Sequence, residues 1–107
     1  MYAVIRRVRF TSVDELKPRI TEDFLPNVVE KLPGFIAYYF VKISEGELES
    51  VALFETREQA EKSIPVINDW SRQHLANLLI GMPEATCGEV IIIKIAKPQA
   101  FPGQMAA

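Results

Sequence analysis

The 107-residue sequence predicts a single α+β domain with the element order strand, helix, strand, strand, helix, strand. Residues 33–55 have the pattern of two strands joined by a tight turn at residues 44–47. On each side of this hairpin, apolar residues recur every three or four positions, as in amphipathic helices. Short apolar runs near the two ends of the sequence supply the first and last strands. With 49% hydrophobic residues, a chain of this length can build one core.

The first strand is expected over residues 2–10. Tyr2, Val4 and Val8 would lie on one face, and Ala3 and Ile5 on the other, because successive side chains of a strand alternate. The first helix then begins at Ser12, where Glu15 three residues later has the spacing of a capping box.

An apolar stripe continues this first helix towards the hairpin through Val13, Leu16, Ile20, Phe24, Val28 and Leu32. Pro18 and Pro26 lie inside the span, and proline has no backbone N–H to donate. We therefore expect the helix to be kinked or divided before it ends at Pro33-Gly34.

The first strand of the hairpin is apolar on both faces. Strict alternation places Phe35, Ala37, Tyr39 and Val41 on one face, and Ile36, Tyr38 and Phe40 on the other. An antiparallel hairpin with one solvated face would instead alternate apolar with polar residues. The helices can cover one face, and a second copy of the chain is the natural cover for the other. The pattern therefore predicts a homodimer in which two sheets pack face to face and approximate a closed barrel.

The second helix is expected from Thr56 to Leu79, with capping-box spacing between Thr56 and Gln59 and a bend at Pro65. Gly81 and Pro83 follow as stop signals. Its expected buried stripe consists of Ala60, Ile64, Ile67, Ser71, His74 and Leu78.

The last strand is expected over residues 86–96, where residues 90–93 put aliphatic side chains on both faces. Residues 97–107 are rich in Pro, Gly and Ala and are expected to form a flexible C-terminal tail, with Phe101 as a possible anchor on a partner. The complete order predicts a ferredoxin-like domain over residues 1–96: a four-stranded antiparallel sheet with two helices on one face.

Composition excludes several classes of function. A net charge of −2 with scattered signs argues against nucleic-acid binding, and the longest aliphatic run is too short to span a membrane. A single cysteine, Cys87, cannot form an internal disulfide, which favours a reducing, cytoplasmic location. One His and one Cys give no metal-ligand spacing, and the five glycines form no phosphate loop. We therefore predict no metal and no cofactor.

Four short segments indicate a family likeness. They are Pro33-Gly34-Phe35, Leu53-Phe54-Glu55-Thr56, Asn68-Asp69-Trp70 and Gly88-Glu89-Val90. With them, residues 1–96 resemble the antibiotic-biosynthesis-monooxygenase-like (ABM-like) proteins of the dimeric α/β-barrel superfamily. Members include cofactor-free monooxygenases of aromatic polyketides and quinols, haem-degrading enzymes, and small stand-alone proteins with no assigned activity. The chain looks most like the last group.

This resemblance implies three alternative functions. The first is binding of a small aromatic ligand, or an accessory role without catalysis. The second is a cofactor-independent monooxygenase of an aromatic hydroxy compound, and the third is a haem-binding protein that uses His74. In the monooxygenases, an Asn on the first strand and a Trp on the second helix hold the substrate. Trp70 matches the helix position, whereas the first strand carries Arg6, Arg7 and Arg9 and no Asn.

The candidate site residues follow from these alternatives. Trp70 and His74 are four residues apart on one helix face and are the candidate catalytic residues. Tyr39, Asn68 and Trp70 are the candidate ligand-binding residues. Each has a structural alternative: Trp70 as a core aromatic, His74 as a residue near the helix end, Tyr39 as core or interface filling, and Asn68 as a surface amide. Tyr38 and Tyr39 lie on opposite faces of their strand, so at most one can face a pocket under the helices.

The arginines of the first strand and the single cysteine have structural explanations. Arg7 and Arg9 share one face of the first strand and Arg6 takes the other, so they cannot converge on one anion. Ion pairs with Glu49 or Glu55 across strands are their expected use. For Cys87, no base is placed near it in the sequence, and no nucleophilic role is predicted.

Overall fold

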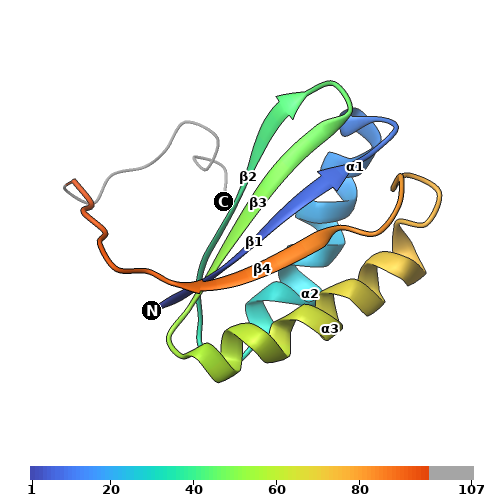
Figure 1. Cartoon of the computed structure of the whole chain (residues 1–107). Coiled ribbons are helices and arrows are strands. Elements are labelled where there is room, and N and C mark those ends of the chain that lie inside the picture. Colours follow the sequence, from blue (N-terminus) through green and yellow to red (C-terminus); the bar gives the residue numbers. More distant parts are fainter. Residues whose placement is uncertain (97–107) are drawn as a thin grey trace.

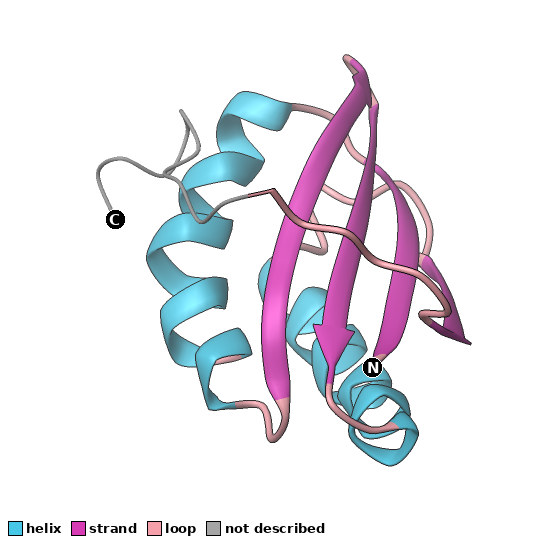
Figure 2. Ribbon diagram, turned by 90° about the vertical axis from the view of Figure 1, so that its left-hand side faces the viewer, coloured by secondary structure: helices cyan, strands magenta, loops and turns pink. Residues whose placement is uncertain are grey.

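A computed structural model, which describes residues 1–96, shows the expected ferredoxin-like order (Figure 1). The four strands are β1 (Tyr2–Arg9), β2 (Phe35–Ser44), β3 (Glu47–Phe54) and β4 (Glu84–Glu89). They form one antiparallel sheet in the order β2-β3-β1-β4. The helices pack together on one face of this sheet (Figure 2), and within residues 1–96 no helix or strand covers the other face.

The first helical segment is divided, as its two prolines predict. It consists of α1 (Val13–Arg19), a π-helical turn η1 (Ile20–Phe24), a short α2 (Leu25–Asn27) and a 3₁₀ turn η2 (Val29–Lys31). The Ser12 hydroxyl accepts a hydrogen bond from the Glu15 N–H at the start of α1, 3.4 Å away. Pro26 has no N–H to donate to the preceding turn, so regular α-helical bonding cannot continue through it. The π-helical turn directs Phe24 into the core.

Helix α3 (Arg57–His74) begins with the predicted capping box: the Thr56 hydroxyl accepts from the Gln59 N–H, and the Gln59 side chain accepts from the Thr56 N–H. Its expected end at Leu79 was wrong. The backbone after His74 turns back to extend the pairing of β1, with hydrogen bonds from the Thr11 N–H to the Leu78 carbonyl (2.8 Å) and from the Ile80 N–H to the Arg9 carbonyl (2.9 Å). The backbone of residues 78–80 cannot make these hydrogen bonds to β1 and continue as a helix, so α3 ends at His74.

The buried face of α3 also differs in part from the expected stripe. Ala60, Ile67 and Ser71 are buried as expected, but Ser63 and Trp70 are buried as well. His74, which was expected in the stripe, is exposed. The buried face of α3 therefore runs along the side of the helix that carries Ser63, Ile67 and Trp70.

Strand β2 contains a bulge that the alternation rule could not show. Phe35 and Ala37 lie opposite consecutive residues of β3, Phe54 and Leu53, so Ile36 is an extra residue in the ladder. Phe35 therefore shares the helix-facing side with Tyr38, and its expected placement with Ala37 was wrong. Its ring packs edge-on against the Phe54 ring, with centroids 6.4 Å apart.

Strand β4 ends at Glu89, seven residues before its expected end. Glu89 lies opposite Tyr2, and the Val90 N–H donates to the Met1 carbonyl at 3.0 Å. Beyond this point β1 offers no further backbone for pairing. Residues 90–96 are not part of the sheet, and Ile91 and Ile92 are 83% and 84% exposed. The expected tail, with Phe101, lies outside the described residues.

The core fills the space between the sheet and the helices in two clusters. The larger one is built around Phe10, Phe24 and Trp70, and the smaller one around Val4 and Phe54. Within the described residues, no helix is both long and apolar enough to cross a membrane.

Candidate functional site

A small cavity lies between the sheet and the helices, inside the larger core cluster. Its volume is about 40 Å³. A cavity needs roughly 10–15 Å³ by this kind of measure to hold one water molecule, so this one has room for only a few atoms of a ligand. Fifteen residues line it: Arg6, Val8, Leu16, Ile20, Phe24, Tyr38, Phe40, Leu48, Ser50, Ile67, Trp70, Ser71, Leu75, Leu79 and Pro83.

Arg6 is the charged residue of this wall. It lies on β1 opposite Ser50 of β3, in a register that turns its side chain towards the helices, and it is only 2% exposed. Its Nη2 donates to the Ile64 carbonyl of α3 at 3.5 Å, which is a long and weak hydrogen bond. Its Nε and Nη1 atoms are buried and have no hydrogen-bond partner among residues 1–96.

The charge of Arg6 is not balanced by a neighbouring acid. Burial lowers the pKa of the Arg6 guanidinium from its ordinary value, and the adjacent Tyr38 phenol partly opposes that shift. A guanidinium nevertheless stays protonated at neutral pH. None of the cavity-lining residues, all within the described part of the chain, is acidic. A buried charge without its partner typically costs ~3–5 kcal/mol, so this arrangement lowers stability and calls for a functional reason.

Polar and aromatic side chains surround the guanidinium. The Tyr38 hydroxyl and the Ser50 hydroxyl lie 3.5 Å apart, and Ser71 adds a third hydroxyl to the wall. The Phe24 ring packs against the Trp70 ring with centroids 4.7 Å apart and meets the Tyr38 ring edge-on at 5.8 Å. The cavity thus offers a cation, hydroxyl groups and the faces of aromatic rings to one ligand.

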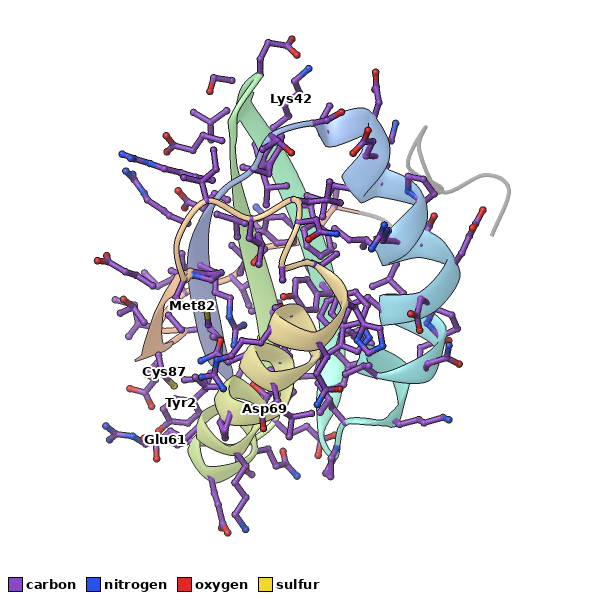
Figure 3. The ribbon with its side chains drawn as sticks, turned by 90° about the vertical axis from the view of Figure 1, so that its right-hand side faces the viewer. Tyr2, Lys42, Glu61, Asp69, Met82 and Cys87 are labelled. Atoms are coloured by element: carbon purple, nitrogen blue, oxygen red, sulfur yellow. The ribbon has the colours of Figure 1, made fainter. Side chains whose placement is uncertain are left out.

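A second, larger hollow lies next to the cavity and shares part of its wall. It has a volume of about 400 Å³, within the usual range for small-molecule sites. Leu16, Ile20, Phe40 and Leu48 line both spaces. Lys42 lines the outer hollow and not the inner cavity. It lies near the turn of the β2–β3 hairpin, whereas Tyr2 of β1 and Cys87 of β4 lie towards the opposite end of the sheet (Figure 3). Movement of the α1 and η1 side chains would connect the two spaces.

Of the candidate catalytic residues, only Trp70 lines the cavity. Trp70 is 8% exposed, and its ring forms part of the wall. The His74 ring stacks on the Trp70 ring, with centroids 5.0 Å apart and planes at 18°. Its Nδ1 lies 3.1 Å from the Trp70 carbonyl oxygen. The structure therefore brings the two residues together but leaves the exposed imidazole outside the cavity.

The other candidate ligand-binding residues lie elsewhere. Tyr39 is 51% exposed on the outer face of the sheet, opposite Val51, so Tyr38 is the tyrosine that faces the cavity. Asn68 is half-buried on α3, and its Oδ1 is buried without a partner among the described residues. It does not line the cavity. Cys87 packs in the smaller core cluster beside Tyr2, away from Arg6.

Arg6 is the site residue that the sequence analysis missed. Cross-strand ion pairs were expected for the arginines of β1, and Arg7 forms one with Glu49 at 3.4 Å. Arg6 forms none within residues 1–96. The available signal was its position: it falls between Val4 and Val8 on the apolar, helix-facing side of the strand. Among the described residues, no three His, Cys, Asp or Glu side chains gather as a metal site would require.

Comparisons with solved structures show the fold. No model of a known protein family matches the sequence, and no curated protein sequence matches it. A protein of unknown function from Nitrosomonas europaea, NE2512, is similar with a TM-score of 0.72 and 14% identity over 91% of this chain and 95% of that one. A dimeric ferredoxin-like protein from an uncultured marine organism has a TM-score of 0.66 and 16% identity, over 90% of this chain and 100% of that one.

The monooxygenase ActVA-Orf6 of Streptomyces coelicolor, solved in complex with nanaomycin D, is also similar. Its TM-score is 0.68 at 12% identity, over 90% of this chain and 92% of that one. At these identities the likeness concerns the fold. The chain therefore has the ferredoxin-like fold of ABM-like monooxygenases and of uncharacterised proteins, as its sequence motifs predicted.

Proposed function

We propose that the protein binds a small aromatic molecule, in a binding or accessory role, with one end in the cavity between its sheet and its helices and the remainder in the adjoining outer hollow. The observation that carries this proposal is the joint placement of Arg6, Tyr38 and Trp70 around one cavity. A cation, hydroxyl groups and aromatic faces are what a protein uses to orient a planar polar ligand.

The surroundings of the cavity favour binding over proton-transfer chemistry. Its lining, drawn from residues 1–96, contains no carboxylate, histidine or lysine that would accept a proton near neutral pH. His74 stacks on the Trp70 ring and is not part of the cavity lining. The volume of about 40 Å³ also leaves no space for a porphyrin without extensive movement, which disfavours the haem-binding alternative.

Ligand binding is testable through Trp70, the single tryptophan of the sequence. We expect saturable quenching of its fluorescence by small phenols and aromatic acids, since a ligand in the cavity would contact the indole. Ile20→Trp would place a larger side chain in the cavity and should abolish ligand binding. Val66→Trp, at an exposed position of α3, is the matched control and should retain it when read by calorimetry. Absence of quenching across the panel would contradict the proposal.

A cofactor-independent monooxygenase is the second candidate. It is favoured by the similarity in fold to the ActVA-Orf6 monooxygenase and by the position of Trp70 in the cavity wall. In this chemistry the aromatic substrate supplies the electrons that reduce oxygen, so the protein must bind it and exclude water. Oxygen uptake with hydroquinones and anthrones that falls in Trp70→Ala would establish it. No uptake above background would leave the binding role.

We further propose that two copies pair through the outer face of the sheet. Ile5, Tyr39 and Val41 of this face are exposed, and so are Ile91 and Ile92 beyond the end of β4. Leaving large apolar side chains in water forfeits ~1.5–3 kcal/mol each. A structurally similar protein is dimeric, which supports this arrangement. Light scattering should give twice the chain mass, and Val41→Glu should reduce it to the monomer, whereas Val66→Glu on α3 should not.

A further inference from the structure

We propose that Arg6 binds a singly charged anionic oxygen group of the ligand, either a carboxylate or an ionised phenol or enol. This inference rests on the proposed ligand site in the cavity and specifies the chemical class of its occupant. The ligand would place its anionic group against the guanidinium and its apolar part among the aromatic rings.

The sign of the ligand charge follows from the unpaired donors of Arg6. A guanidinium carries five N–H donors, of which one belongs to Nε and two to Nη1. Both of these atoms are buried and lack an acceptor among the described residues. Because proteins pair their buried charges, the missing partner is an anion or a strong oxygen acceptor.

The size of the ligand charge follows from the composition of the wall. Arg6 is the one residue of the cavity lining, within residues 1–96, that carries a full charge. One guanidinium balances one negative charge. A phosphate dianion would remain partly unbalanced in this apolar setting, whereas a carboxylate or a phenolate would be neutralised.

The rest of the ligand is constrained by the rings and by the available volume. Trp70, Phe24 and Tyr38 offer apolar surface beside the guanidinium. The inner cavity, about 40 Å³, accommodates the anionic head group. A larger ligand would extend past the shared wall of Leu16 and Ile20 into the outer hollow of about 400 Å³. A small aromatic or enolic acid fits these requirements.

The experiment compares charged probes with neutral isosteres by isothermal titration calorimetry at constant ionic strength. Acetate against acetamide tests the head group alone, and benzoate against benzamide tests the carboxylate on a ring. 4-Nitrophenol against 4-nitroanisole, at a pH where the phenol is ionised, tests the phenolate. Each anion should bind at least about tenfold more tightly than its isostere if a charge-assisted contact is formed. The carboxylate and phenolate arms identify which oxygen chemistry is preferred.

Two arginine variants connect the effect to this residue. Arg6→Met keeps the length of the side chain without its charge and should bring the anion and its isostere to within about twofold of each other. Arg7→Met is the matched control, because Arg7 is the next residue on the same strand and points to the exposed face. It should keep the full preference. If Arg6→Met fails to fold, the anion-to-isostere comparison on the wild-type protein still decides the question.

The outcomes separate this inference from the function on which it rests. Anion preference that is lost in Arg6→Met and kept in Arg7→Met supports the inference. Equal binding of anions and neutral isosteres overturns it but leaves a ligand site in the cavity. Binding of none of the six probes, together with no quenching of Trp70, overturns both.

Discussion

Replacing Arg6 by methionine should stabilise the ligand-free protein. The wild-type protein keeps a guanidinium that is 2% exposed, with one long hydrogen bond of 3.5 Å and no acidic partner among the described residues. Exchanging buried ionic groups for well-packed apolar residues of similar volume often gains 1–4 kcal/mol, and the lost hydrogen bond offsets roughly 1 kcal/mol of this. We therefore expect the free energy of unfolding to rise by about 0–3 kcal/mol. In a domain of this size, each kcal/mol gained corresponds to an increase in Tm of roughly 4–8 °C.

Urea unfolding followed by circular dichroism measures this change directly. Arg7→Met serves as the control, because it breaks only the partly exposed ion pair with Glu49 and should cost about 0–1 kcal/mol. A loss of more than about 1 kcal/mol in Arg6→Met would refute the reasoning. It would mean that Arg6 already has a stabilising partner in the ligand-free protein and is not held ready for a ligand.

Two further predictions concern the start of helix α3. Gly34 has a φ of +71°, and a Cβ there would collide with the Gln59 side chain, which belongs to the α3 capping box. Gly34→Ala should therefore lower the free energy of unfolding by about 1–3 kcal/mol. Gly88→Ala, which meets open space, should have a much smaller effect in the same thermal melts. The hydrogen bond from Lys62, followed by its charge, lowers the pKa of Glu58. The contribution of Glu58 to stability is thus fully present above about pH 4.3 and is lost as pH falls through its folded-state pKa. Urea unfolding of wild type and Glu58→Gln should differ at pH 7 and converge at acidic pH, and an unchanged difference would contradict this pairing.

The sequence predicted the order of the elements because that order depends on periodicity and on local signals. The capping box at Thr56 and the division of the first helical segment, which contains Pro18 and Pro26, are local in this sense, and both were confirmed. The end of α3 and the end of β4 were wrong, since both depend on how far the backbone of β1 extends for pairing. That information is not local to either segment.

The candidate site was predicted only in part, for a related reason. The face on which Phe35 lies depends on a bulge at Ile36, and a bulge has no reliable mark in an alternating apolar strand. Trp70, one of the candidate residues, lines the cavity, but Arg6 was assigned to ion pairs with Glu49 or Glu55 across the strands. A single sequence shows that Arg6 lies on the apolar face of β1; it does not show that no acid lies opposite. That fact emerges from packing, and it is the feature that gives the cavity its chemical character.

The most direct test of the central claim is the ¹H–¹⁵N spectrum of the arginine Nε–H groups during titration with acetate. A buried Nε–H exchanges slowly with water, so Arg6 should give a distinct signal that is absent from Arg6→Met. We predict that this signal shifts in a saturable manner with acetate and stays in place with acetamide. An Arg6 signal that does not move with acetate, or that moves equally with acetamide, would contradict the assignment of this cavity as an anion-binding site.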